Sequence, residues 1–267
     1  MGDEIAEFKT RQREVWAMGN FADIAAFTTI TAGRLVRFAG VKAGQKLLDV
    51  ACGTGVVSIT AARKGAQVTG LDLTPELVEQ ARQSAPIAGL KIDWKEGDAE
   101  ALPYGDAAFD VVLSQFGHMF APRPEVAIKE MLRVLKPGGR LAFATWPPET
   151  FVGRSFALSG RYVPPPPGSP PSPTLWGDIN VIRERLGSAV QGIFHERGDM
   201  AVPTLSPEHF IAWRSTKIGP FIKSMEILKK DPAKLDAYVR EYTALIGEYL
   251  EDNLVHHEYL LTRAIKV

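Results

Sequence analysis

The sequence predicts an α/β fold in which helices cover both faces of a parallel β-sheet. Short apolar runs alternate with helical patterns between Lys46 and Trp146, which is typical of strand–helix–strand units. These runs are apolar at nearly every position, as expected for strands buried on both faces. The chain has 267 residues, of which 45% are hydrophobic, enough for one large α/β unit with an appended cap.

The first 40 residues are expected to form two helices that meet near Gly19-Asn20. Strands are predicted at 46–52, 66–73, 91–98, 109–116 and 139–146, with helices at 56–65, from Thr74 onward, and at 124–136. Thr74 should cap its helix through the hydroxyl, with Pro75 in the first turn. Pro137-Gly138-Gly139 should end the helix at 124–136.

The pattern loosens after Trp146. Residues 164–173 hold seven prolines in ten positions, so a stiff surface loop is predicted, with a ligand for a proline-recognising domain as the alternative. Beyond it we expect a helix at 177–187, a strand at 192–202, mostly helix at 206–250 and a terminal strand at 256–267.

The charge balance argues against a nucleic-acid partner. Thirty-one basic and thirty-one acidic side chains give a net charge of zero, whereas nucleic-acid binding usually needs a basic excess. A small-molecule partner is therefore expected. With Cys52 as its single cysteine, the sequence predicts no internal disulfide and no metal site.

The N-terminal stretch is too charged for a secretory signal. No run approaches the roughly 18 apolar residues that a membrane span needs. We therefore expect a cytoplasmic protein without a transmembrane segment. The oligomeric state cannot be predicted from these patterns.

The run LLDVACGTGVVSI, residues 47–59, suggests a ligand site. Gly53 and Gly55 allow a tight turn between a strand and a helix, where exposed amides favour an anionic group. Asp72, at the end of the next strand, suits both hydroxyls of a ribose. Nicotinamide dehydrogenases share both features, so these residues indicate only an adenosine-containing cofactor.

Three further residues separate the two classes. Ser58 stands where a dinucleotide fingerprint has its third glycine. Asp49, just before the turn, suits a cationic methionyl ammonium but would repel a pyrophosphate. Asp98, after the third strand, could accept a hydrogen bond from the adenine amino group. These residues favour S-adenosylmethionine over a nicotinamide cofactor.

LLDVACGTG, GLDLTPELVEQAR, EGDAEALPYGDAAFDVV and LRVLKPGGRLAFATW resemble, in order and spacing, the motifs of class I S-adenosylmethionine-dependent methyltransferases. The branch with the ubiquinone and menaquinone biosynthesis C-methyltransferases is most similar. The resemblance covers roughly residues 40–150 and implies a Rossmann-like, seven-stranded sheet whose last strand is antiparallel. It also implies that residues 1–40 cover the cofactor, 41–150 bind it, and 151–267 form an acceptor-binding cap plus the final strands.

The resemblance implies a role for each cofactor residue. Asp49 and the turn should surround the methionine part, Asp72 the ribose, and Leu73, Asp98 and Ala99 the adenine, with Gln115 beside the cofactor. Trp16 belongs to a segment, 16–21, that resembles an element folding over the cofactor, although Phe21 lacks the hydroxyl that relatives often carry there. The residues expected at the cofactor are Trp16, Asp49, Ala51, Gly53, Thr54, Gly55, Asp72, Leu73, Asp98, Ala99 and Gln115.

His118, just past the fourth strand, is the candidate catalytic base, with pocket lining as the alternative. Cys52 is expected to be small and buried rather than nucleophilic. Aromatic residues of the late region should form either core or a lid over an apolar acceptor: Trp176, Phe210, Trp213 and Phe221. His195, His256 and His257 are not expected to bind metal, and the last two should point to opposite faces of a strand.

The predicted function is methyl transfer to a small, apolar or phenolic, quinol-like acceptor. Two alternatives stay open: a non-catalytic protein that binds S-adenosylmethionine or S-adenosylhomocysteine, and an NAD-dependent oxidoreductase.

Overall fold

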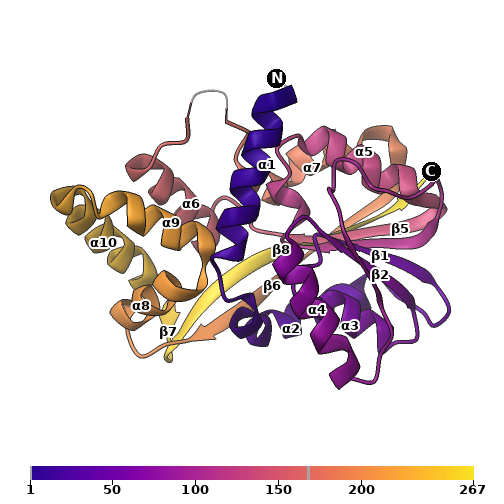
Figure 1. The fold of residues 1–267 in the computed structure, drawn as a ribbon, viewed down its shortest axis with the longest axis horizontal. Coiled ribbons are helices and arrows are strands. Elements are labelled where there is room, and N and C mark those ends of the chain that lie inside the picture. Colours follow the sequence, from indigo (N-terminus) through magenta and orange to yellow (C-terminus); the bar gives the residue numbers. More distant parts are fainter. Residues whose placement is uncertain (1, 167–168) are drawn as a thin grey trace.

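A mixed eight-stranded β-sheet organises the computed structural model, which describes residues 2–166 and 169–267 (Figure 1). Its order is β3-β2-β1-β4-β5-β8-β6, with short β7 paired to β8. Strands β1 to β5 pair in parallel, whereas β8 is antiparallel to β5 and β6. The strands are β1 Lys46–Val50, β2 Gln67–Asp72, β3 Asp93–Glu96, β4 Phe109–Gln115, β5 Leu135–Thr145, β6 Val190–Pro203, β7 Leu250–Glu251 and β8 Leu254–Lys266.

The central strands are apolar because helices cover the sheet on both sides. Leu47, Leu48 and Val50 of β1 each have 0% of their surface exposed. In Figure 1, α2, α3 and α4 lie below the sheet, and α5 and α7 lie above it. These helices are α2 Phe21–Phe38, α3 Val56–Ala62, α4 Pro75–Ile87, α5 Pro124–Val134 and α7 Ile179–Leu186. The predicted α/β class and the antiparallel last strand are confirmed.

Four helices form a cap at one end of the sheet, on the left in Figure 1: α6 Phe151–Tyr162, α8 Pro207–Lys217, α9 Gly219–Leu228 and α10 Pro232–Gly247. Helix α1, Gly2–Ala17, crosses between this cap and the sheet and contacts α9. Short 3-10 turns lie at His118–Phe120, Pro173–Gly177 and Gly187–Ala189. The cap is therefore placed to close over the carboxyl ends of the parallel strands.

The sequence prediction was wrong in local details. Helix α6 was not predicted, and Pro137-Gly138-Gly139 belongs to β5 rather than ending a helix, because Leu135 already adopts extended backbone at φ −80° and ψ 136°. Thr74 is the N-cap of α4, but its hydroxyl makes no capping hydrogen bond. Of the proline-rich loop, residues 167–168 lie outside the described residues, and 164–166 and 169–172 form no helix or strand.

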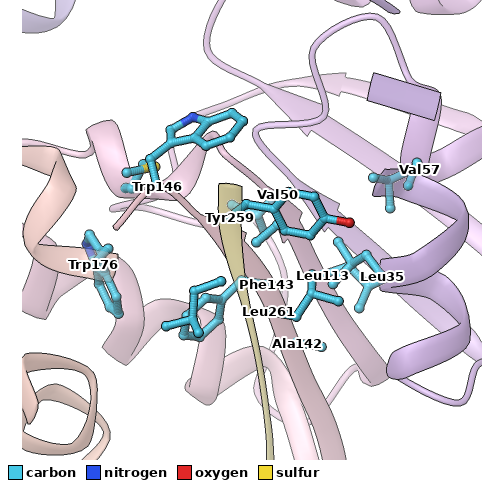
Figure 2. Packing of buried hydrophobic residues seen from close by; sticks show 14 of the residues in the cluster. Leu35, Val50, Val57, Leu113, Ala142, Phe143, Trp146, Trp176, Tyr259 and Leu261 are labelled. Carbon is cyan, nitrogen blue, oxygen red and sulfur yellow. The ribbon is translucent and has the colours of Figure 1, made fainter. Parts of the chain in front are cut away.

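Aromatic and aliphatic side chains from distant parts of the chain meet in the core. Figure 2 shows Phe143 of β5 beside Trp176, whereas Leu113 of β4 lies close to Leu35 of α2. By the strand register, Leu261 of β8 is on the same face of the sheet as Leu113, and Phe143 is on the other face. The rings of Phe143 and Trp176 are 5.6 Å apart between centroids and meet edge to face. At the end of β5, Trp146 stacks on Phe116 with ring centroids 3.7 Å apart. The core thus ties the cap connection to the central strands.

Gly55, the N-cap of α3, permits no side chain. Its φ is +84°, and a Cβ there would lie 2.5 Å from the Trp94 ring. We expect Gly55→Ala to lower the free energy of unfolding by about 1–3 kcal/mol through backbone strain and overpacking. Urea denaturation measures this. Gly160→Ala is the control, because Gly160 lies in α6 with open space around it and should gain stability. Equal effects of the two substitutions would contradict this account.

Candidate active site

A cavity of about 370 Å³ lies where the carboxyl ends of β1, β2 and β4 meet α1, α2 and the cap. Ten of the residues predicted for the site line it, namely Trp16, Ala51, Gly53, Thr54, Asp72, Leu73, Asp98, Ala99, Gln115 and His118. Asp49 and Gly55 lie behind this lining. The cavity continues from the turn after β1 to aromatic side chains of the cap, among them Phe156, Trp213 and Phe221.

The turn after β1 is held by Asp72. Ala51, Gly53 and Gly55 have left-handed backbone, with φ of 55°, 53° and 84°. The Gly53 N–H donates to Asp72 Oδ2 at 2.8 Å, and the Thr74 N–H donates to Oδ1 at 2.9 Å. Burial raises the pKa of Asp72. Each carboxylate oxygen keeps further acceptor capacity, so Asp72 can support the turn and still accept hydrogen bonds from a ligand.

Asp49 is a buried carboxyl with half of its hydrogen-bonding capacity unused. Its Oδ2 accepts a hydrogen bond from Ser58 at 2.6 Å, whereas Oδ1 has no partner among the described residues. Burial raises the pKa of Asp49 to about 7. A cation at the adjacent turn would satisfy this carboxyl directly or through water. The orphaned oxygen and the amide-rich turn therefore fit the methionyl part of S-adenosylmethionine.

Lys9 of α1 reaches the loop after β3. Its ammonium donates to Asp98 Oδ2 at 2.5 Å and to Glu100 Oε2 at 2.6 Å. Asp98 Oδ1 also accepts from the Glu100 N–H at 2.8 Å. Asp98, Ala99 and Leu73 line the same part of the cavity. The N-terminal helix is thus fastened beside the place predicted for adenine, a contact that the sequence pattern did not indicate.

Trp16 of α1 and Gln115 of β4 also line the cavity. Trp16 packs against Phe120 and Phe21, with ring centroids 4.8 and 5.6 Å apart. Gln115 Nε2 donates to the Thr28 carbonyl at 3.3 Å, while its Oε1 is buried without a partner among the described residues. Gln115 therefore offers an unused acceptor at the end of β4.

His118 is enclosed by aromatic rings. Its ring lies 4.7 Å from that of Phe143 and 4.8 Å from that of Trp176, between centroids. Only 1% of the residue is exposed, and neither ring nitrogen has a hydrogen-bond partner in the described part of the chain. Burial, with a smaller contribution from Arg185, lowers the pKa of His118 to about 3. The imidazole is therefore neutral.

His257 of β8 is a second histidine in the lining, and sequence reasoning did not select it. Its Nδ1 lies 2.9 Å from the Val255 carbonyl. Because a carbonyl only accepts, Nδ1 carries the proton and Nε2 is left as the acceptor. Burial and then Arg214 lower the pKa of His257 to about 3. Side chains alternate between the two faces of β8, so neighbouring His256 points away from the cavity and pairs with Asp199 at 2.6 Å. This alternation is the sequence signal that could have identified His257.

Acid should destabilise the fold through these two histidines. Since their pKa values are about 3 in the fold and about 6.5 when unfolded, only the unfolded chain binds these protons between those values. The free energy of unfolding then falls, as pH drops through this window, by up to about 1.4 kcal/mol per pH unit for each histidine. Asp49, whose pKa is raised to about 7, and Asp72, whose pKa burial also raises, contribute with the opposite sign, because the fold holds their protons more tightly than the unfolded chain does.

His118→Phe isolates one of these contributions, because Asp49 and His257 titrate in both proteins. We expect its stability to fall less steeply between about pH 6 and 4, by about 1.4 kcal/mol per pH unit relative to the parent. Urea denaturation at a series of pH values measures the difference. Parallel stability curves for the two proteins would contradict the buried, neutral state of His118.

Comparisons with known proteins identify the family. A family model described as a methyltransferase domain matches residues 48–143. The chain is 37% identical over 259 residues to the uncharacterized protein Rv1403c of Mycobacterium tuberculosis, covering 96% of this chain and 94% of that protein. It is also 45% identical over 104 residues to the ubiquinone/menaquinone biosynthesis C-methyltransferase UbiE of Roseobacter denitrificans, covering 38% and 42% of the two chains. The chain is a class I S-adenosylmethionine-dependent methyltransferase.

The fold of this methyltransferase is also similar to that of a solved structure. The YcgJ protein from Bacillus subtilis aligns with a TM-score of 0.62 over 88% of this chain and 97% of that one, at 18% sequence identity. Within residues 2–166 and 169–267, no helix has the length and apolar character needed to cross a membrane. The same described residues contain no cluster of three or more His, Cys, Asp or Glu side chains arranged to hold a metal ion.

Proposed function

We propose that this methyltransferase transfers the methyl group in line to a small, largely apolar acceptor of phenolic or quinol-like type. One observation carries the proposal: a single cavity joins the turn after β1 to the aromatic side chains of the cap. A donor at the turn and an acceptor among the rings would share one enclosed space. The division of the chain follows, with residues 1–40 covering the cofactor, 41–150 binding it and 151–267 holding the acceptor.

Different residues along the cavity would hold different parts of the cofactor. Asp49 and the backbone of Ala51, Gly53, Thr54 and Gly55 would hold the methionine part, and Asp72 the ribose. Leu73, Asp98 and Ala99 would hold the adenine, with Trp16 and Gln115 at the sides. When bound, S-adenosylmethionine supplies a methyl group already activated by its sulfonium. The chain then has to orient the acceptor behind this methyl, exclude water and, for a phenol or carbon acid, accept a proton.

Two histidines are candidates for the base that accepts this proton. His118 is the candidate predicted from the sequence, and His257 is added by the lining of the cavity. The geometry favours His257, because the Val255 carbonyl fixes its Nδ1–H and leaves Nε2 to accept the proton of an acceptor hydroxyl. His118 has no such orienting partner among the described residues.

Calorimetric titration with S-adenosylhomocysteine, with NADH in parallel, tests the cofactor assignment. We expect binding of the former alone. Incubation with methyl-labelled S-adenosylmethionine and a small-molecule extract then tests transfer. Binding of NADH would overturn the assignment, whereas S-adenosylhomocysteine binding without transfer to any component of the extract would favour the non-catalytic alternative.

A further inference from the structure

Arg214 is a cation of the cap that has no acidic partner within residues 2–166 and 169–267. It lies in α8 and lines the cavity. Its guanidinium carbon is 5.3 Å from the centroid of the Phe221 ring and 5.6 Å from that of Phe210. The rings of Phe151 and Tyr242 are each 5.9 Å away. The guanidinium therefore lies in an aromatic cage that opens on the acceptor end of the cavity.

The cage leaves at least one buried donor of Arg214 unused. Its Nε is buried and has no hydrogen-bond partner in the described part of the chain. Aromatic faces attract the positive charge but provide no strong acceptors for the five N–H groups of a guanidinium. Tyr242 donates its hydroxyl to Ser155 at 3.3 Å, and Ser155 donates in turn to the Phe151 carbonyl at 2.7 Å. Arg214 is partly buried, and a buried N–H of a cation that lacks an acceptor is costly, so an external anion that accepts from Arg214 would relieve it.

Other cations of this region are already neutralised. Lys9, which also lines the cavity, pairs with Asp98 and Glu100. Lys217, one turn after Arg214 in α8, pairs with Asp23 at 2.5 Å. Among the described Lys and Arg side chains of the lining, Arg214 is thus the one with no carboxylate within ion-pair distance.

His257 lies beside the same cage. Its ring centroid is 4.8 Å from that of Phe151 and 5.8 Å from that of Phe210, the two rings that also contact Arg214. The positive charge of Arg214 contributes to the lowered pKa of His257. An anion on Arg214 would offset that charge and make Nε2 a stronger base. The two side chains thus place an anion-binding group next to a proton acceptor.

We propose, building on the proposed function, that the methyl acceptor is an organic acid whose anionic oxygen binds the Arg214 guanidinium while its apolar body lies among the surrounding rings. A carboxylate and an ionised phenol both provide this chemistry, and a guanidinium binds either through charge-assisted hydrogen bonds. The neutral quinol-like part of the acceptor then lies toward His257.

The test measures binding to the full chain saturated with S-adenosylhomocysteine. The probes are benzoate, 4-hydroxybenzoate and 3-phenylpropionate with their primary amides, and 4-nitrophenol with 4-nitroanisole. We expect an acid to bind at least about tenfold more tightly than its neutral counterpart. A preference confined to the carboxylates, or to the phenol, identifies the source of the anion.

Arg214→Met should abolish this preference and leave the affinity for S-adenosylhomocysteine within about twofold, and Arg214→Lys should restore part of the preference. Arg154→Met is the matched control. Arg154 also lies over an aromatic ring, Tyr249, at 5.5 Å, but it pairs with Glu248 and does not line this cavity. It should keep the preference intact.

Three results would overturn the proposal: neutral analogues that bind as tightly as the acids, acids that do not bind at all, or an acid preference that survives in Arg214→Met. These failures are distinct from failure of the proposed function. If S-adenosylhomocysteine does not bind the parent protein, the cofactor assignment itself fails. If it binds and no acid is preferred, only the role of Arg214 is lost.

Discussion

Asp72→Asn is expected to weaken S-adenosylhomocysteine binding by about 100-fold or more. The substitution replaces one acceptor oxygen by an NH₂ group, which cannot accept from the ribose or from a backbone amide. Asp72 also receives the Gly53 N–H at 2.8 Å, so the turn itself loses a partner. Loss of charge-assisted hydrogen bonds at about 1.5–3 kcal/mol each corresponds to this range of affinity. Calorimetric titration at neutral pH measures the effect.

Asp93→Asn is the matched control for this measurement, because Asp93 is exposed on β3 and does not line the cavity. Its affinity should equal that of the parent. Thermal unfolding without ligand shows whether Asp72→Asn is still folded. An Asp72→Asn protein that is folded and binds as tightly as the parent would exclude Asp72 from cofactor binding.

His257→Gln is expected to lower methyl transfer by about 10²- to 10⁴-fold, the usual contribution of a positioned general base. Glutamine can form hydrogen bonds but cannot take the proton at the place of Nε2. S-adenosylhomocysteine affinity should stay unchanged, because His257 lies at the acceptor end of the cavity. In His257→Gln, the part of the pH dependence of the rate that comes from protonation of His257 should also disappear. Single-turnover assays with labelled cofactor measure the rate.

His256→Gln controls for substitution on the same strand, since His256 points to the opposite face and pairs with Asp199. His118→Phe, assayed beside it, tests the candidate predicted from the sequence. A large loss in His118→Phe together with near-parent activity in His257→Gln would assign the base to His118. Near-parent activity in both would mean that the acceptor loses its proton without a histidine.

The cofactor end was predictable because its residues are consecutive and constrained by backbone geometry. Gly53 and Gly55 supply positive φ in the turn at 51–55, and Asp72 ends the apolar strand β2. The parallel strands then bring both to one edge of the sheet. Sequence spacing alone was therefore enough to predict that these residues lie close together.

The acceptor end was not predictable in the same way. Arg214 and His257 come from α8 and β8, and only tertiary packing brings them to the same two phenylalanine rings. In the sequence, Arg214 resembles any other charged residue of a helix, because only the folded structure shows that no carboxylate lies near it. Helix α6 was overlooked for a related reason: its buried face packs on α10, so its pattern has meaning only once the cap is assembled.

The place of β8 in the sheet has a consequence for biosynthesis. Strand β8, Leu254–Lys266, follows both β5 and β6 in the chain, yet it lies between them in the sheet. Until it leaves the ribosome, β5 presents an open edge and β6 has no neighbour in this sheet. His257 arrives with the same strand. A nascent chain can therefore assemble β1 to β5 early, but the proposed acceptor site and the pairing of β5 and β6 with β8 are completed together, once β8 has been made.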